Sequence, residues 1–347
     1  MSYLMIAGGL VLLFLGGEAL VRGSVGIARR LGLSELVIGL TLVGFGTSVP
    51  ELVTSLRAVS QDAVGMSVGN VAGSNVANIL LVLGIAALIR PIVTHPKALT
   101  RDFSVMVGVT FLFGWLVYSD LFTRPIGIGL VALLLGYMIG SLLLDRRQGG
   151  HGDVANMHAD EGELIETPDP LPIAALLAIG GIAGVVIGAR ILVTGGIDIA
   201  AQFGVSETLI GLSIVAFGTS LPELATAAVS AMRGKSDVAL GTVLGSNIFN
   251  ILGIIGVTAI VHPFSLYEGG PGLAGSGFNI GEAIAGATHN VGLTWTDIST
   301  LILSIFLVFL FAFTGKRIAR AEGAIMVAAY LIYMGFLFNI LPVSFAS

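Results

Sequence analysis

Two copies of one stretch of sequence decide how this chain folds. The first reads Gly39-Leu-Thr-Leu-Val-Gly-Phe-Gly-Thr-Ser-Val-Pro-Glu51, and the second reads Gly211-Leu-Ser-Ile-Val-Ala-Phe-Gly-Thr-Ser-Leu-Pro-Glu223. The offset of 172 residues (211 − 39) continues without a gap through Gly73-Ser-Asn-Val-Ala-Asn78 over Gly245-Ser-Asn-Ile-Phe-Asn250. Eleven of the first twenty pairs that follow from Gly39 and Gly211 are identical, which indicates an internal duplication.

The composition around these copies excludes a soluble protein. Of the 347 residues, 55% are hydrophobic and only 11% are charged, whereas soluble chains carry about 25% charged residues. Charged residues come in runs separated by about twenty apolar positions, the length of a helix that crosses a hydrocarbon core. The chain has no cysteine, which excludes disulfides, iron–sulfur sites and thiol catalysis. Its net charge of −5 arises in one acidic stretch, so we expect no nucleic-acid partner.

Ten apolar segments can be placed along the chain, five on each side of the acidic stretch. They cover about 3–21, 36–59, 67–89, 103–119, 125–144, 172–193, 207–231, 237–261, 297–314 and 323–341. Because each half holds an odd number of spans, the second copy enters the membrane from the opposite side, as in the inverted repeats of secondary transporters. We therefore predict an all-α membrane protein with ten transmembrane helices in two inverted five-helix repeats, with broken helices at the centre.

The acidic stretch divides the chain into two halves. We expect residues 1–147 to form the first half, residues 148–170 a solvated linker, and residues 171–347 the second half. The second half includes a glycine-rich loop at 263–296, to which the sequence assigns no role.

Positive charge predicts the orientation. Every Lys and Arg except Arg57, Arg124 and Arg190 falls on the side of the membrane that holds the linker. Cytoplasmic loops retain such an excess of positive charge. We therefore expect a multi-pass protein of the cytoplasmic (inner) membrane, with the linker in the cytoplasm and both termini and the glycine-rich loop outside.

Two acids stand in the middle of predicted spans, Glu51 in the second and Glu223 in the seventh. An acid at the centre of a bilayer costs about 2.5–3.5 kcal/mol on insertion scales, so such acids usually serve a function. Each directly follows a proline, which frees the carbonyl oxygen four residues earlier, at Gly46 and Gly218. We expect both helices to break there and to present carbonyl oxygens beside the acids.

Other oxygen-bearing side chains recur at helical spacing around these acids. They are Thr47 and Thr219, four residues before each acid, and the i, i+4 pairs Ser74 with Asn78 and Ser246 with Asn250. An all-oxygen site with two carboxylates suits Ca²⁺, which takes roughly 6–8 oxygen ligands, better than Mg²⁺ or transition metals. For Asn75 and Asn247, the neighbouring amides, hydrogen bonding between helices is a strong alternative to any role at the ion.

These motifs resemble the paired α-repeats of the sodium/calcium exchangers, in the cation/Ca²⁺ antiporter superfamily, and the chain resembles the prokaryotic type. The resemblance covers both halves and the position of the linker. It implies exchange of several Na⁺ for one Ca²⁺ by alternating access, with the first and sixth helices sliding across the other eight. The ions would be substrates, and the resemblance implies no cofactor and no obligatory protein partner. Potassium-dependent relatives end the second motif in Phe-Asp, whereas this chain has Phe249-Asn250, which disfavours K⁺ co-transport.

The resemblance also assigns ligands, motif position by motif position. It implies that Ca²⁺ binds to Glu51 and Glu223 together with oxygens of Thr47 and Thr219. It adds ligands for Na⁺ from the hydroxyls of Ser48, Ser220, Ser74 and Ser246 and from the backbone carbonyls of Gly44 and Ala216. Asn78 and Asn250 would flank the centre.

Two other modes of transport remain open at this point. Ca²⁺/H⁺ exchange could operate through protonation of Glu51 and Glu223, and a passive cation channel could be lined by the same oxygens. An intramembrane enzyme is disfavoured because the chain has neither a His-Glu-x-x-His motif nor a serine with a plausible base. A separate hypothesis concerns Glu18 and Arg190, which are 172 residues apart and could form an ion pair between the first and sixth helices.

Overall fold

The computed structural model describes residues 1–60, 64–94, 96–147, 170–202, 216–266, 295–314 and 317–337. Most of the linker at 148–170 and of the glycine-rich loop at 263–296 lies outside these ranges, as do residues 211–215 of the second motif. The predictions made for those segments stay predictions.

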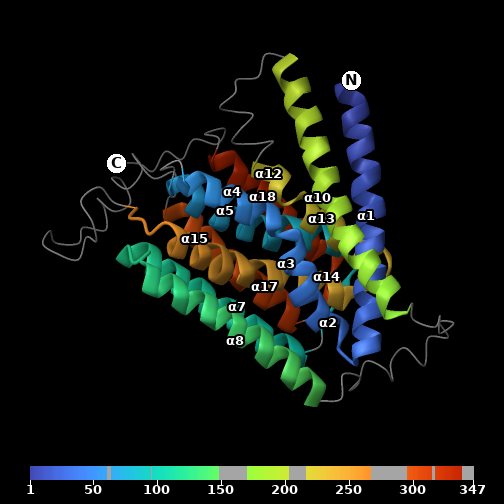
Figure 1. Ribbon diagram of the computed structural model, residues 1–347, viewed down its shortest axis with the longest axis horizontal. Coiled ribbons are helices and arrows are strands. Elements are labelled where there is room, and N and C mark those ends of the chain that lie inside the picture. Colours follow the sequence, from blue (N-terminus) through green and yellow to red (C-terminus); the bar gives the residue numbers. More distant parts are fainter. Residues whose placement is uncertain are drawn as a thin grey trace, which may run out of the picture.

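Helices make up almost all of the described chain (Figure 1). In the first half they are α1 (Ser2–Leu31), α2 (Glu35–Ile38), α3 (Gly44–Thr47), α4 (Val49–Ser60), α5 (Val64–Val76), α6 (Leu83–Ile89), α7 (Pro96–Ser119) and α8 (Arg124–Arg147). In the second half they are α10 (Leu171–Gln202), α12 (Ala216–Thr219), α13 (Leu221–Met232), α14 (Ser236–Ile248), α15 (Gly256–Val261), α17 (Trp295–Thr314) and α18 (Arg320–Leu337). Three π-helical segments, η1 (Gly39–Val43), η2 (Ala77–Val82) and η4 (Phe249–Ile255), and two short strands, β1 (Ile92–Val93) and β2 (Arg317–Ile318), complete the described elements.

The chain is a helical membrane protein. In its described part, six helical segments are long and apolar enough to cross a bilayer, and a seventh forms if the bent pair 36–47 and 49–60 is one span. The continuous helices 64–89 and 236–261 are 78% and 83% buried over their most apolar windows, whereas the corresponding windows of α1 and α10 are only 33% buried. The two buried helices therefore form the centre of the molecule, and α1 and α10 lie at its periphery.

Helices α1 and α10 lie side by side and stand at a steep angle to the other helices (Figure 1). Their contact is made of glycines whose backbones touch the opposite helix. A Cβ atom added at Gly23 would lie 2.4 Å from the Ala178 nitrogen, and one added at Gly181 would lie 2.4 Å from the Leu20 nitrogen. Small residues allow such close approach between membrane helices. The fit ties α1 and α10 to each other along much of their length.

Short backbone pairings connect the two halves at equivalent places. Strand β1, directly after α6, pairs antiparallel with β2 so that Ile92 lies opposite Ile318. In the equivalent pairing, Phe122 forms an isolated antiparallel bridge with Phe264, which lies 172 residues after Ile92. The two phenylalanine rings stack with their centroids 4.6 Å apart. In each half, the segment that follows the buried helix (64–89 or 236–261) therefore pairs with the connection between the last two helices of the other half.

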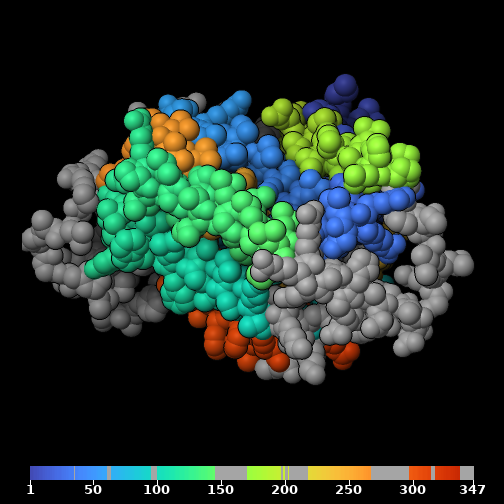
Figure 2. All heavy atoms as spheres, turned by 60° about the horizontal axis from the view of Figure 1, so that its bottom comes forward, coloured from blue at the N-terminus to red at the C-terminus, as the bar shows by residue number. Residues whose placement is uncertain are grey.

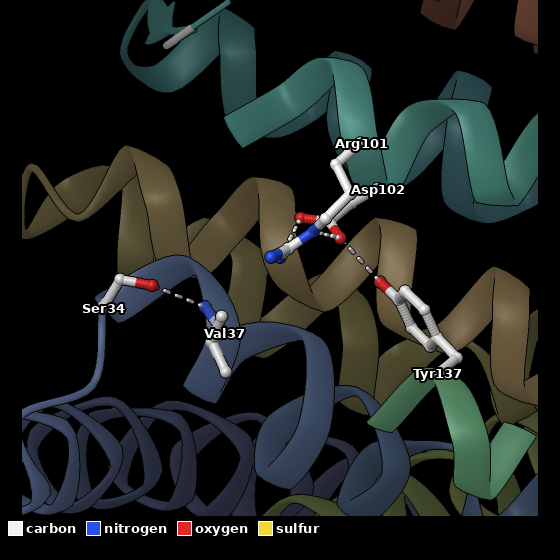
Figure 3. A network of polar contacts seen from close by, with 5 residues as sticks. All are labelled: Ser34, Val37, Arg101, Asp102 and Tyr137. Carbon is white, nitrogen blue, oxygen red and sulfur yellow. Dashed lines mark hydrogen bonds and ion pairs between the residues drawn. The ribbon is translucent and has the colours of Figure 1, made fainter. Parts of the chain in front are cut away.

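A second pair of equivalent contacts fastens the last two helices of each half. The Tyr137 hydroxyl of α8 donates to Asp102 of α7 at 3.1 Å, and Arg101 also binds that carboxylate (Figure 3). The Tyr333 hydroxyl of α18 donates to Asp297 of α17 at 2.6 Å. The aspartates lie 195 residues apart and the tyrosines 196 (297 − 102 and 333 − 137), so the duplication extends beyond the motifs at a longer offset. In space-filling view, α8 forms a band of side chains across one face (Figure 2).

Candidate ion-binding site

Both motif helices break one residue before the Val-Pro-Glu or Leu-Pro-Glu sequence. Helix α3 ends at Thr47 and α4 begins at Val49, and the two segments differ in direction by 44°. In the second copy, α12 ends at Thr219 and α13 begins at Leu221. The residues between the helices, Ser48 and Ser220, have similar backbone angles (φ −85°, ψ 9° and φ −86°, ψ 4°). The expected breaks are therefore present, and they place a hydroxyl at each turn.

Both acids are buried, and each is contacted by a hydroxyl group from the other half of the chain. Glu51 and Glu223 are 1% and 0% exposed. The Ser48 hydroxyl donates to Oε1 of Glu223 at 2.9 Å, and the Thr219 hydroxyl of the second copy contacts the Glu51 carboxylate. The carboxylates are close enough to repel each other when both are charged. Each acid is thus held by the broken turn of the opposite copy.

Helix α14 supplies a further hydroxyl group, and its backbone lies against the backbone of the first copy. Helix α3 contacts α14, and Ser246 of α14 donates to the Gly44 carbonyl at 3.1 Å. The same carbonyl also accepts from the Ser48 nitrogen and the Thr47 hydroxyl, each at 3.3 Å. In reciprocal fashion α12, which begins at Ala216, contacts α5, the helix that carries Ser74. Ser74 and Ser246 are both buried.

Glycines make this approach possible at α14. A Cβ atom at Gly245 would lie 2.1 Å from the Leu40 carbonyl oxygen, and one at Gly241 would lie 2.5 Å from that of Leu36. Glycine at both positions therefore allows the two backbones to pack at close distance. At Gly69 and Gly73, the equivalent residues of α5, an added Cβ atom would meet nothing within 4 Å beyond the adjacent backbone of its own helix, among the residues that the structure describes.

The amides of the two asparagine motifs meet across the interface between the halves. Asn250 donates to Oδ1 of Asn75 at 2.9 Å, and Asn78 donates to Oδ1 of Asn247 at 3.4 Å. All four are at most 1% exposed. Asn78 lies in η2 and Asn250 in η4, so both ion-flanking candidates are carried by π-helical turns. Such turns are frequent at functional sites.

Several buried oxygens at this centre have no hydrogen-bond partner in the described part of the chain. They are Oε2 of Glu51, Oε2 of Glu223, Oδ1 of Asn78, Oδ1 of Asn250 and the Ser220 hydroxyl. Leaving one such polar group unpaired in the interior costs about 1–3 kcal/mol, and a charged group costs more. Four of the five occupy equivalent positions in the two copies. They form a set of acceptors suited to a cation.

The family follows from a comparison with known proteins. The family model described as sodium/calcium exchanger protein matches residues 1–143 and 173–339, which is nearly the whole chain outside the linker. The chain belongs to the sodium/calcium exchanger family. Members of this family are antiporters of the cation/Ca²⁺ exchanger superfamily and not enzymes, so the resemblance found in the motifs is confirmed.

Two relatives match this exchanger chain over almost its whole given length. It is 38% identical to the putative antiporter CaxA of Alkalimonas amylolytica, covering 95% of this chain and 97% of the relative. It is 32% identical to the sodium/calcium exchanger MaX1 of Methanosarcina acetivorans, covering 98% and 99%. A solved structure of the sodium–calcium exchanger NCX_Mj, soaked with 10 mM Na⁺ and no Ca²⁺, superimposes with a TM-score of 0.75 at 30% identity, covering 96% and 98%.

One contact differs from the sequence hypothesis. Glu18 of the exchanger pairs with Arg233, at the end of α13, and not with Arg190. The pair is bidentate, with N···O distances of 2.6 and 2.8 Å. Sequence reasoning placed Glu18 correctly near a neighbouring helix but chose the partner by repeat position alone. The partner lies instead on a turn between motif helices, which the offset of 172 residues does not identify.

Proposed function

We propose that this chain exchanges Na⁺ for Ca²⁺ across a membrane, with ten transmembrane helices arranged as two inverted repeats. The observation that carries the proposal is the set of equivalent buried oxygens without partners at Glu51, Glu223, Asn78 and Asn250. A cation is the ligand that such acceptors favour, because the two carboxylates otherwise repel each other in a medium of low dielectric constant. Two carboxylates balance one Ca²⁺, and several Na⁺ could replace it.

The connections between the halves support the inverted arrangement. Each half pairs the segment after its central helix with the other half, through Ile92 with Ile318 and through Phe264 with Phe122. Each half also holds its last two helices with an Asp–Tyr hydrogen bond. Three further elements, α17, α18 and the pair α12–α13, would complete the count of ten. Inner-membrane location, external termini and a cytoplasmic linker remain part of this proposal, from the charge distribution.

The proposed site comprises twelve residues. Carboxylates of Glu51 and Glu223 with oxygens of Thr47 and Thr219 would bind Ca²⁺. Hydroxyls of Ser48, Ser220, Ser74 and Ser246 and carbonyls of Gly44 and Ala216 would bind Na⁺, with Asn78 and Asn250 beside them. The Gly44 carbonyl accepts from Ser246, Thr47 and the Ser48 nitrogen in this structure, so its use as a ligand would compete with these hydrogen bonds.

Helices α1 and α10 are suited to act as the moving part. Their glycine contacts join them to each other, and side chains of α10 reach the broken turns. A Cβ atom at Gly46 would lie 2.4 Å from Ile182, and one at Gly218 would lie 2.2 Å from Val193. Sliding of this pair would carry Ile182 and Val193 across the turns beside the ions, and would thereby open the site to one side at a time.

Flux into proteoliposomes tests the proposal. Vesicles loaded with Na⁺ are diluted into Na⁺-free buffer with radioactive Ca²⁺, and the assay is repeated with a proton gradient alone and with no gradient. Uptake that requires internal Na⁺ is expected. Uptake driven by the proton gradient alone would assign Ca²⁺/H⁺ exchange instead, and uptake independent of both gradients would assign a channel.

Two variants locate the site in the same assay. Glu51→Gln and Glu223→Gln should each abolish uptake, because each removes a carboxylate from the cation. Glu322→Gln serves as the matched control, since Glu322 accepts from the Ala319 nitrogen at the start of α18 and glutamine can also cap a helix. Full activity in either site variant would contradict the site.

A further inference from the structure

The four central asparagines form two crossed pairs related by the repeat. Asn75 and Asn247 are equivalent, as are Asn78 and Asn250, at the offset of 172 residues. Asn250 donates to Asn75 and Asn78 donates to Asn247, so each ion-flanking amide gives its NH₂ group to the other half. The other hydrogen bonds of these residues determine what the crossing achieves.

A side-chain amide carries an acceptor oxygen at one end and a donor nitrogen at the other. Rotation of the terminal group by half a turn exchanges the two, so an asparagine beside a cation can present either attraction or repulsion. For Asn78 and Asn250 the nitrogen is engaged, and Oδ1 is buried without a partner in the described part of the molecule. The crossed hydrogen bonds therefore select the orientation in which oxygen faces the site.

The accepting amides are themselves held in place. Asn75 donates its NH₂ group to the Asn247 backbone carbonyl at 3.3 Å. Asn247 donates its own to the sulfur of Met106 on α7, at 3.7 Å. Because their nitrogens are engaged by these acceptors, both residues leave Oδ1 to accept from the ion-flanking amide of the other half. A thioether is a weak acceptor, so the hold on Asn247 is looser than the hold on Asn75.

We propose that Asn75 and Asn247 are positioning residues, which act through Asn250 and Asn78 to keep amide oxygens directed at the transported cation. They do not contact the ion themselves. This inference rests on the proposed function, because it presupposes a cation at the centre. It goes beyond the alternative that the sequence offered for this pair, which was hydrogen bonding between helices, since it gives the hydrogen bonds a direction and a consequence for affinity.

A double-mutant cycle separates this role from a packing role. Asn75→Leu keeps the size of the side chain and removes the acceptor, which frees the Asn250 amide to rotate. Asn250→Asp makes that position insensitive to rotation, because both ends of a carboxylate are oxygen. Asn75→Leu should weaken Ca²⁺ binding about 10- to 100-fold beside Asn250, the range measured for partners that orient metal ligands, and less than about 3-fold beside Asp.

The readout is the dissociation constant of Ca²⁺ for the purified full-length chain, measured by calorimetry, with thermal unfolding recorded for each variant. Ser304→Ala is the control, since that buried hydroxyl of α17 donates only to its own helix, at Leu301. Equal losses in the Asn250 and Asp backgrounds, or no loss in either, would overturn the inference. If Asn75→Leu does not fold, the same criterion applies to Asn247→Leu with Asn78→Asp.

Failure of this inference is distinguishable from failure of the proposed function. Unchanged Ca²⁺ affinity in Glu51→Gln and Glu223→Gln would remove the cation site itself. Loss of binding in those variants together with equal effects of Asn75→Leu in both backgrounds would leave the site in place and overturn only the positioning role. The weaker contacts of Asn247 give a further expectation, that Asn247→Leu costs less affinity than Asn75→Leu.

Discussion

The surroundings of the two central acids differ although their motifs match. Behind Glu51, helices α4 and α5 are joined by polar side chains. Asn70 donates to the Glu51 carbonyl at 3.3 Å and to the Ser55 hydroxyl at 3.0 Å, and Ser55 in turn lies 3.5 Å from the Ser67 carbonyl. The first acid therefore sits on a pair of helices that is held together by hydrogen bonds.

Behind Glu223, the equivalent positions hold Thr242, Ala227 and Ala239. The Thr242 hydroxyl bonds to Val238 of its own helix at 2.8 Å, so none of the three replaces the hydrogen bonds made by Asn70. The two copies have kept the residues of the proposed ion site and have diverged one layer behind it. The comparison teaches that the duplication preserves the residue types of the centre, while the layer behind each acid differs in polarity and hydrogen bonding.

The largest effect is expected where the two copies touch. In Gly245→Ala the new methyl group would lie 2.1 Å from the Leu40 carbonyl oxygen, and backbone atoms cannot move aside as a flexible side chain can. Overpacking of this kind costs typically 1–3 kcal/mol and sometimes more. We expect a large drop in melting temperature and loss of exchange. Thermal unfolding in detergent measures it.

The control for that variant is Gly136→Ala on α8. This position is exposed, and the new methyl group would meet nothing within 4 Å beyond the adjacent backbone of its own helix, among the described residues. It should leave the melting temperature unchanged or raise it, since alanine is the better helix former. Equal melting temperatures for Gly245→Ala and the parent chain would refute the close crossing of the copies.

The second prediction compares the serines of the two broken turns. Ser48 donates to Glu223 at 2.9 Å, whereas the buried Ser220 hydroxyl has no partner in the part of the molecule described. Without ions, Ser48→Ala should destabilise the protein by about 1.5–3 kcal/mol, because a buried carboxyl group loses its donor. Ser220→Ala should be near neutral. Chemical denaturation in ion-free buffer distinguishes them, and a larger loss from Ser220→Ala would reverse the asymmetry.

The repeat predicted the centre of the site better than its surroundings. Proline before Glu51 and Glu223 correctly placed the helix breaks, because a missing amide hydrogen has the same consequence in any fold. The π-helical turns at Asn78 and Asn250 were not predicted, since no residue type marks them and only tertiary packing selects them. The pairing of β1 with β2 across the two halves was also not predicted, because a two-residue strand leaves no periodic pattern.

Pairing between distant surface charges was the least predictable feature. Repeat position suggested that Glu18 meets Arg190, yet its partner is Arg233. Long charged side chains reach several neighbours, and the choice among them depends on helix angles that a sequence does not contain. The hydrogen bonds of Tyr137 with the buried Asp102 and of Tyr333 with the buried Asp297 were not predicted either, because their shared spacing becomes visible only when the contacts are known.

The third prediction places residues of the second copy at the equivalent positions of the first. Asn70→Thr with Ser55→Ala gives the first copy two of the residues that stand behind Glu223. The loss of the two hydrogen bonds donated by Asn70, at about 1 kcal/mol each, should destabilise the protein by about 1–2 kcal/mol, and the long 3.5 Å contact of Ser55 adds little. The reverse change Thr242→Asn can donate to the Glu223 backbone carbonyl but meets no acceptor at Ala227, so it should stabilise by no more than about 1 kcal/mol, the contribution of one hydrogen bond. Melting temperatures of the three proteins measure this, and a stabilisation by Thr242→Asn as large as the loss in the double variant would contradict the interpretation.

The smallest effect is expected at the ion pair between Glu18 of α1 and Arg233, at the end of α13. Both side chains are partly exposed, at 30% and 57%, and exposed pairs contribute only about 0–1 kcal/mol. If α1 and α10 slide as one body, this pair holds the present position and must break. Glu18→Gln should therefore change the exchange rate by no more than about 5-fold, and Arg233→Gln should have the same effect without adding to it. Arg190→Gln, the equivalent position in α10, should leave the rate as it is. Additive effects of Glu18→Gln and Arg233→Gln would mean that the two residues act separately and that α1 is held elsewhere.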